Sequence, residues 1–235
     1  MAGLAESGSN PDVDLLYDIN SLARNAPRWF DRVMEYVGEY GLLLAMVLLV
    51  LACWWSVRRR DGEGAASAVA ALVWAPLAAG LAVLVNVPIR DFVQRPRPFL
   101  DHRGLDVLVP GKTDYSFVSD HATITMAMAV ALFVVDRRFG LAGIALALFE
   151  GFCRVYLGVH YPTDVVGGFA LGTAVALLLS PPAMALLTPL MKAVEGSAWG
   201  GRLVRARRGG GTGDALVSGC SAGERASAED RDLAA

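Results

Sequence analysis

Three long uncharged segments constrain the fold of this 235-residue chain more than any other feature of its sequence. Residues 41–57, 64–89 and 165–191 contain no Asp, Glu, Lys or Arg. About 18 consecutive apolar residues are enough for a helix to cross the hydrocarbon layer of a membrane. With 19% charged residues, the chain is also less polar than soluble domains, in which roughly a quarter of residues are charged. The sequence therefore indicates a polytopic membrane protein and excludes a disordered chain or a small disulfide scaffold.

The apolar pattern predicts an all-α membrane helix bundle with five transmembrane helices. The predicted spans are residues 41–57, 65–89, 121–135, 139–158 and 164–188. The third and fourth segments are short or contain a charge, and by length alone either could be a buried helix of a soluble domain. Before them, apolar and charged residues alternate at helical spacing from Leu15 to Tyr40. This pattern predicts an amphipathic interfacial helix, broken near Pro27, with a sixth span as the alternative.

The composition also predicts how the chain is divided. Residues 1–13 are expected to be a disordered N-terminus, 14–190 the membrane-embedded domain, and 198–235, rich in Gly, Ala, Ser and charge, a disordered tail. The first 23 residues contain no Lys or Arg, so no cleavable signal peptide is expected. Three cysteines in separate segments indicate no disulfide framework, and a net charge of −2 points to no nucleic-acid partner.

Basic residues beside the spans predict the orientation. Arginines cluster at residues 58–60, 137–138 and 202–208. Loops rich in Lys and Arg remain in the cytoplasm, so these three sites and the C-terminal tail are expected to be cytoplasmic. The loop at 90–120 and the turn at 158–164 then face the extracytoplasmic side of the plasma membrane.

The first polar cluster lies in the 90–120 loop and contains Arg90, Arg95 and Arg97. The planar guanidinium group matches the geometry of phosphate and binds it with two hydrogen bonds. The cluster therefore indicates an oxyanion site, and contact with lipid headgroups is the alternative for this cluster alone.

The second cluster, Ser119, Asp120 and His121, opens the third predicted span. Ser119 or Asp120 is a natural N-cap, and the free N–H groups of a first helical turn favour anions. A simple cap beside an incidental histidine is the alternative interpretation.

The third cluster contains Arg154, His160 and Asp164. Asp164 falls in the first turn of the fifth span, four residues from His160, where a carboxylate can fix the tautomer of the imidazole; a structural His–Asp cap is the alternative. Two histidines and an aspartate could suggest zinc, but the nearby arginines would repel a cation. We therefore expect an anionic substrate and no metal. Glu150, one helical turn before Arg154, is predicted to form a supporting ion pair with it, and direct participation in catalysis is the alternative.

Together, the three clusters resemble the tripartite signature of the type-2 phosphatidic acid phosphatase superfamily. The motifs Arg-x6-Arg-Pro, Ser-x-His and Arg-x5-His-x3-Asp occur in the family's order and span about residues 90–164. The Ser-Asp-His triplet, the Arg-Pro-Arg-Pro-Phe string and the early Asp-Ile-Asn-Ser-Leu-Ala segment are most similar to bacterial undecaprenyl-diphosphatases of the bacitracin-resistance type. That similarity extends over about residues 15–188.

Four positions depart from the family pattern. Arg90 stands where Lys is usual, Val118 where Pro is usual, Asp120 where Gly is common, and Cys153 where Ser precedes the arginine. Asp120 adds a negative charge beside an anion site, and Cys153 removes a hydroxyl that could bind phosphate. None of the four is a residue that makes or breaks bonds.

The resemblance implies a role for each motif residue. His160 would be the nucleophile, Asp164 would hold its ring, and His121 would be the general acid and base. The phosphate-binding residues would be Arg90, Arg97, Ser119 and Arg154, supported by Arg95, Asp120 and Glu150.

The resemblance also implies a reaction. The chain would hydrolyse a polyprenyl diphosphate to the monophosphate and phosphate, without a cofactor, and so recycle the carrier lipid of cell-wall synthesis. The alternatives are a glycerolipid phosphatase acting on phosphatidic acid or phosphatidylglycerophosphate, and a non-catalytic membrane protein that binds lipid phosphates.

Overall fold

The computed structural model describes residues 10–59, 64–197 and 200–204, which are helical with connecting loops and contain no β-strand. The helices are α1 (Pro11–Asn25), α2 (Arg28–Tyr36), the π-helical turn η1 (Val37–Gly41), α3 (Leu42–Arg58), α4 (Ala65–Val93), α5 (Pro98–Asp101), α6 (Asp120–Val135), α7 (Arg137–Tyr156), α8 (Pro162–Leu178), α9 (Ser180–Glu195) and α10 (Gly201–Val204). The all-α membrane bundle predicted from the sequence is confirmed.

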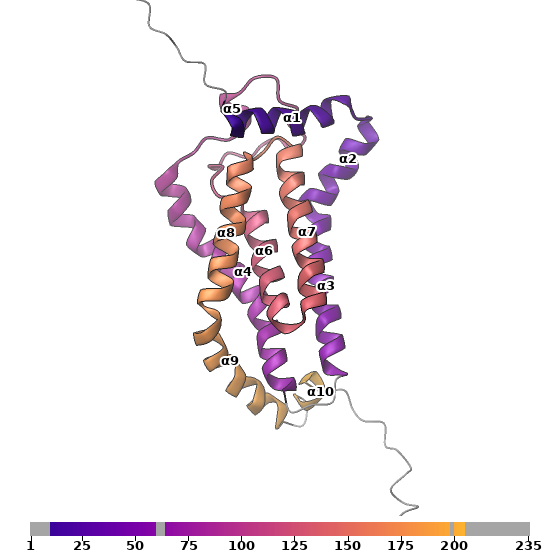
Figure 1. Ribbon diagram of the computed structural model, residues 1–235, viewed down its shortest axis with the longest axis vertical. Helices are drawn as coiled ribbons and strands as arrows, with labels where there is room; N and C mark the ends of the chain where they lie inside the picture. The colour runs from indigo at the N-terminus through magenta and orange to yellow at the C-terminus, as the bar shows by residue number, and fades with distance from the viewer. Residues whose placement is uncertain (1–9, 60–63, 198–199, 205–235) are drawn as a thin grey trace, which may run out of the picture. The chain divides into compact units, whose positions relative to one another are not determined.

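Helix α6 is the centre of the bundle and packs against α4, α7 and α8 (Figure 1). Its contact with α8 depends on two glycines, because a Cβ at Gly168 would lie 2.8 Å from the carbonyl oxygen of Ser119. A Cβ at Gly172 would lie 2.5 Å from the carbonyl oxygen of Thr123. Small residues of this kind let helix backbones approach closely in membranes. The close approach brings the beginnings of α6 and α8, which carry the second and third motifs, side by side.

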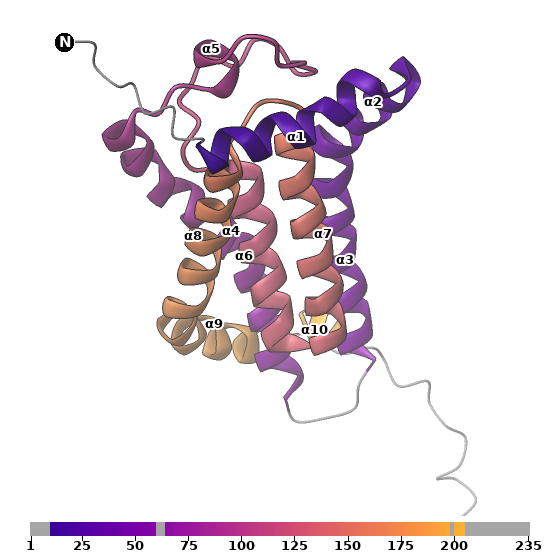
Figure 2. The same cartoon turned by 45° about the horizontal axis from the view of Figure 1, so that its top comes forward.

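The N-terminal segment forms two parts joined at Pro27. Ala26 is extended (φ −83°, ψ 153°), as expected for a residue that precedes proline, so the predicted break is confirmed. Helix α1 lies across the ends of α7 and α8 (Figures 1 and 2). After the break, α2, η1 and α3 form one helical stretch from Arg28 to Arg58. Helix α3 begins at Leu42, one residue after the predicted start of the first span at residue 41, and the chain reaches it through η1 without leaving the helix.

The lengths of the helices set limits on the membrane spans. Among the described residues, three helical stretches are long and apolar enough to cross a membrane, namely Arg28–Arg58, Ala65–Asp101 and Arg137–Tyr156. The predicted fifth span, 164–188, is divided into α8 and α9, which are bent by 52° at Leu179 and count as a fourth span if the pair crosses together. Two prolines, Pro181 and Pro182, follow the bend and supply no backbone N–H to continue the helix. Helix α6 is apolar but shorter, so the count of five spans remains a prediction.

The two ends of the bundle differ in chemistry. Arg58 and Arg59 close α3, and Arg137 and Arg138 open α7, so these four arginines share what we call the basic end (Figure 1). At the opposite end, the motif end, α6 and α8 begin and α7 finishes.

Helix α4 continues to Val93, so the expected loop at 90–120 starts later and Arg90 lies in the last turn of a helix. Most of the two segments that were predicted to be disordered, 1–13 and 198–235, lies outside the described residues. The described part of the first segment includes the start of α1 at Pro11, and the described part of the second includes α10, which begins at Gly201.

Candidate active site

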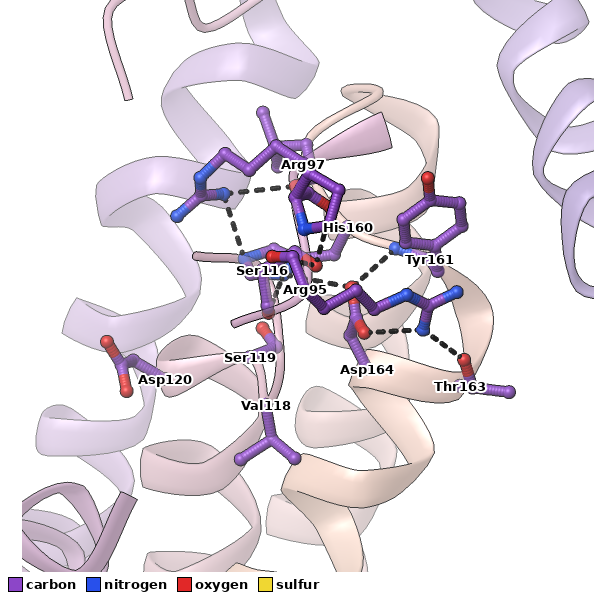
Figure 3. A network of polar contacts seen from close by, with 12 residues as sticks. Arg95, Arg97, Ser116, Val118, Ser119, Asp120, His160, Tyr161, Thr163 and Asp164 are labelled. Carbon is purple, nitrogen blue, oxygen red and sulfur yellow. Dashed lines mark hydrogen bonds and ion pairs between the residues drawn. The ribbon is translucent and has the colours of Figure 1, made fainter. Parts of the chain in front are cut away.

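Three contacts join the motifs at the motif end (Figure 3). The backbone N–H of Ser119 donates to the carbonyl oxygen of Asp164 at 3.1 Å, which links the second motif to the third. Arg97 donates from Nη1 to the carbonyl oxygen of Val159 at 3.0 Å, which links the first motif to the third. The N–H of Ser116 donates to the carbonyl oxygen of Arg95 at 2.9 Å. Segments that are 21 to 62 residues apart in the chain therefore lie together.

His160 is buried, and each of its ring nitrogens faces a different group. Nδ1 lies 2.9 Å from the carbonyl oxygen of Ser116, and Nε2 lies 3.4 Å from Nη1 of Arg97. Because a carbonyl oxygen only accepts hydrogen bonds, the contact with Ser116 assigns the proton to Nδ1. Burial and the positive charge of Arg97 lower the pKa of His160, and together they outweigh the opposing effect of Asp164. His160 is therefore a neutral imidazole, and the lone pair of its Nε2 accepts a long hydrogen bond of 3.4 Å from Nη1 of Arg97.

Asp164 lies behind His160 but does not hold it as directly as the sequence suggested. Its Oδ2 is 3.7 Å from Nδ1 of His160, beyond hydrogen-bond distance. The same oxygen accepts the backbone N–H of Tyr161 at 2.9 Å, which caps helix α8. Its Oδ1 accepts from Nη1 of Arg95 at 2.8 Å. Asp164 therefore acts on the imidazole through its charge, while the carbonyl group of Ser116 fixes the tautomer.

Arg95 is directed toward carboxylates rather than toward open space. Besides Asp164, it pairs through Nη2 with Asp12 of helix α1 at 2.7 Å, and its guanidinium lies 3.7 Å from the centre of the Tyr161 ring. Asp12 also accepts the backbone N–H and the hydroxyl of Thr163 at 2.9 and 2.6 Å. Arg95 thus ties α1 to the first turn of α8 and supports Asp164.

Arg90 and Arg97 share one acidic partner, Asp114, which belongs to none of the three motifs and was not predicted. Arg97 donates to Oδ1 of Asp114 at 2.7 Å, and Arg90 lies 3.2 Å from its Oδ2. Arg90 also contacts Asp120, whose side chain points away from His160 (Figure 3). Burial raises the pKa of Asp114, but hydrogen bonding and charge from Arg97 outweigh it and hold that pKa below the usual value. Both arginines are therefore neutralised by carboxylates in the structure.

Arg154 is fully buried and has three partners. Nη1 contacts Oε2 of Glu39 at 3.0 Å, Nη2 donates to the carbonyl oxygen of Gly38, and Nε lies 3.0 Å from Oε1 of Glu150. The expected ion pair between Glu150 and Arg154 is thus present. Glu39 was not predicted, and it also accepts from Nζ of Lys112 at 3.1 Å.

Ser119 and His121 are the two remaining predicted site residues. The hydroxyl of Ser119 is buried and has no hydrogen-bond partner among the described residues, so it can donate to a substrate. His121 lies in the first turn of α6, where the charges of Arg154, Glu39, Lys112 and His160 act on it. Within the described part of the chain, no group of three or more His, Cys, Asp and Glu side chains is placed to hold a metal ion.

Comparison with known proteins agrees with this geometry. The sequence model of the PAP2 superfamily matches residues 69–182 of this chain. A decaprenylphosphoryl-5-phosphoribose phosphatase from Mycobacterium tuberculosis is 31% identical over 181 residues, which are 75% of this chain and 93% of the relative. The chain belongs to the PAP2 superfamily. The undecaprenyl-diphosphatase BcrC of Bacillus subtilis is 29% identical over 148 residues, which cover 63% of this chain and 72% of that relative.

Two solved structures share the fold. A transmembrane PAP2-type phosphatidylglycerolphosphate phosphatase from Bacillus subtilis matches with a TM-score of 0.53 and 23% identity, over 76% of this chain and 89% of that chain. LpxE of Aquifex aeolicus matches with a TM-score of 0.55 and 18% identity, over 74% and 96%. The chain therefore has the fold of these PAP2 membrane proteins.

Proposed function

We propose that this PAP2 protein hydrolyses an undecaprenyl-type polyprenyl diphosphate to the monophosphate and inorganic phosphate, through a phosphohistidine intermediate. The observation that carries this proposal is the setting of His160. Its Nδ1 proton is directed to the carbonyl of Ser116, and its unprotonated Nε2 accepts from Nη1 of Arg97 at 3.4 Å, the guanidinium that a phosphoryl oxygen would take as its partner. A nucleophile beside a phosphate-binding guanidinium is the arrangement that phosphoryl transfer to a side chain requires.

In the first step, Nε2 of His160 attacks the terminal phosphorus, and a new N–P bond forms. The bond between that phosphorus and the bridging oxygen breaks, and His121 gives its proton to the leaving oxygen of the polyprenyl monophosphate. The ring of His160 becomes positively charged, and the nearby carboxylate of Asp164 stabilises that charge.

In the second step, a water molecule attacks the phosphorus of the phosphohistidine. His121, now neutral, takes a proton from the water, the N–P bond breaks, and inorganic phosphate leaves. His160 returns to its neutral form with the proton on Nδ1. Neither step needs a metal ion, because guanidinium groups stabilise the charge that spreads over the phosphoryl oxygens.

Binding of the phosphoryl group is assigned to Arg90, Arg97, Arg154 and the hydroxyl of Ser119. Since Asp114 pairs with both Arg90 and Arg97, the substrate must displace this carboxylate, which is 46% exposed. Because an ion pair open to water contributes little stability, displacing the Asp114 carboxylate costs little free energy.

The lipid nature of the substrate follows from the position of the site. The site lies at the ends of apolar helices, where a headgroup can reach it while its chain stays in the hydrocarbon. We infer that the motif end is extracytoplasmic and that the C-terminal tail is cytoplasmic, because arginines gather at the basic end. The names of the relatives, an undecaprenyl-diphosphatase and a decaprenylphosphoryl-5-phosphoribose phosphatase, favour a polyprenyl substrate.

The proposal is tested by measuring phosphate release from a panel of lipids in detergent, with EDTA present. The panel contains undecaprenyl diphosphate, undecaprenyl phosphate, decaprenylphosphoryl-5-phosphoribose, phosphatidic acid and phosphatidylglycerophosphate. We expect the highest kcat/KM for undecaprenyl diphosphate and none for a His160→Ala variant. Preference for a glycerolipid would assign the protein to the glycerolipid phosphatases. Lipid binding without turnover would show a non-catalytic protein, and loss of activity in EDTA would refute the metal-free mechanism.

A further inference from the structure

Lys112 belongs to the same charged cluster as the motif residues, although none of the three motifs contains it. Its Nζ lies 3.1 and 3.4 Å from the two carboxylate oxygens of Glu39. Glu39 in turn contacts Nη1 of Arg154 at 3.0 Å. One carboxylate therefore bridges two cations, Lys112 from the loop before α6 and Arg154 from the end of α7. The Lys112 side chain is 21% exposed, so water and ligands can reach it.

The turn that carries Glu39 is fitted closely to Arg154. Glu39 lies in the π-helical turn η1, and π turns inside helices are frequent at functional sites. In the same turn, Gly38 accepts a hydrogen bond from Nη2 of Arg154, and a Cβ at Gly38 would lie only 2.9 Å from Cβ of Cys153. This turn precedes residues 69–182, which the family model matches. The N-terminal segment thus adds to the site a carboxylate that the matched region does not contain.

The bridging carboxylate shows where this cluster stabilises an anion. Two cations that converge on one pair of oxygens offer charge-assisted hydrogen bonds to a carboxylate or to a phosphate alike. The cluster also lies near the general acid, since the charges of Lys112, Glu39 and Arg154 all act on His121. His121 faces the leaving oxygen in the proposed reaction, whereas His160 and Arg97 face the phosphorus that is attacked. From this we infer that Lys112 lies on the leaving-group side of the site.

We propose that Lys112 binds the phosphate group that the lipid keeps after hydrolysis, and so selects diphosphates over monophosphates. This inference rests on the proposed function, because only a diphosphate places a second phosphate beyond the oxygen that His121 protonates. On binding, the retained phosphate replaces Glu39 as the partner of Lys112, and Arg154 lies between the two phosphates. A phosphate monoester has no group at that position, so it gains nothing from Lys112.

The test compares Lys112→Met with Lys112→Arg in the full chain, using undecaprenyl diphosphate and undecaprenyl phosphate as substrates. The matched control is Lys192→Met, because Lys192 in α9 is the chain's second and last lysine. A hydrogen bond to a charged group changes binding by roughly ten- to a hundredfold. We expect Lys112→Met to raise the KM for the diphosphate by that factor and to leave kcat/KM for the monophosphate within about twofold. Lys112→Arg should restore the diphosphate KM, and Lys192→Met should change neither.

Inhibition by inorganic ions gives a second measurement that does not depend on the lipid chain. Pyrophosphate should inhibit the wild-type protein more strongly than orthophosphate, and Lys112→Met should weaken inhibition by pyrophosphate alone. If the variant loses activity on both substrates equally, Lys112 has a structural role and the inference is overturned. An unchanged diphosphate KM also overturns it while leaving the proposed function intact. A wild-type protein that hydrolyses only monophosphates overturns both.

Discussion

Nδ1 of His160 lies 2.9 Å from the carbonyl oxygen of Ser116, in the loop that precedes helix α6. A backbone carbonyl cannot donate a hydrogen bond, so it holds the imidazole in one tautomer whatever the state of nearby side chains. The loop itself is fixed, because Ser116 donates from its N–H to Arg95 at 2.9 Å and from its hydroxyl to Pro96 at 3.1 Å. The tautomer of the proposed nucleophile is therefore set by the backbone, and Asp164 contributes charge.

This division of roles predicts a graded effect of substitutions. Where a carboxylate alone sets the tautomer of a catalytic histidine, its loss costs about 10⁴ in kcat. Here the tautomer survives in Asp164→Asn, so we expect kcat to fall by only about 10², while His160→Ala abolishes turnover. The Asn side chain can still accept from the N–H of Tyr161 and cap α8. Steady-state phosphate release measures both variants, and an Asp164→Asn variant that is folded but as inactive as His160→Ala would refute the assignment.

The buried position of His160 predicts the pH dependence of activity. Because its pKa lies below the ordinary value of 6.5, the imidazole stays neutral and nucleophilic in mildly acidic solution. We therefore expect the acidic limb of kcat/KM, which reports the free enzyme, to lie below pH 6.5. The carboxylate of Asp164 raises this pKa, so Asp164→Asn should move the limb to still lower pH as kcat falls. A limb above pH 7 in the wild-type protein would contradict this prediction.

Local sequence signals were sufficient to locate the proposed nucleophile. Pro162 and Asp164 follow His160 at the spacing of a helix start, and the structure begins α8 at Pro162. Ser119 is likewise the residue before the first turn of α6. These positions depend on residues a few places apart in the chain, and such short-range patterns can be recognised without knowing the fold.

Glu150 was found through its short spacing from Arg154, but the distant carboxylates that pair with the arginines could not be found in this way. Glu39 and Arg154 are 115 positions apart, and Asp12 and Arg95 are 83 apart. Their pairing depends on how the helices pack, which neither periodicity nor composition encodes. The bend at Leu179 was missed for a related reason, since hydropathy measures how apolar a segment is and not its direction. Pro181 and Pro182 were the one local signal of that bend.

The buried hydroxyl of Ser119 predicts an effect on binding without an effect on stability. Because this hydroxyl has no partner among the described residues, Ser119→Ala removes no internal hydrogen bond. We expect the KM to rise roughly tenfold, the value of one hydrogen bond to a charged group, with an unchanged Tm. Thr125→Val is the control, because the Thr125 hydroxyl donates to the backbone carbonyl oxygen of His121 at 2.8 Å and its loss does remove an internal hydrogen bond. A lowered Tm for Ser119→Ala would show that the hydroxyl is a structural group.

For replacement of Glu150 we expect the opposite result, a larger effect on stability than on catalysis. Its carboxylate is fully buried and lies 3.0 Å from Nε of Arg154. In Glu150→Gln, Arg154 keeps its contacts with Glu39 and Gly38, so the loss should be smaller than the 3–5 kcal/mol or so of a buried charge left alone. We expect a lower Tm in detergent and kcat within about threefold of wild type. A folded Glu150→Gln variant without activity would instead place Glu150 among the catalytic residues.

The contact between α6 and α8 predicts that a single methyl group can disturb the site from a distance. In Gly172→Ala, the new Cβ would lie 2.5 Å from the carbonyl oxygen of Thr123 and 2.9 Å from the amide nitrogen of Ala127. Both are backbone atoms and cannot turn aside, so the two helices must move apart, at a cost of about 1–3 kcal/mol typical of overpacking.

The same movement would lengthen the 3.1 Å hydrogen bond from Ser119 to Asp164, and kcat should fall together with Tm. Gly80→Ala in α4 is the matched control, because a Cβ there meets no atom within 4 Å. Thermal unfolding and phosphate release from both variants in one detergent decide the matter. If Gly172→Ala were as stable and as active as Gly80→Ala, the close approach of α6 and α8 could not be what holds the second and third motifs together.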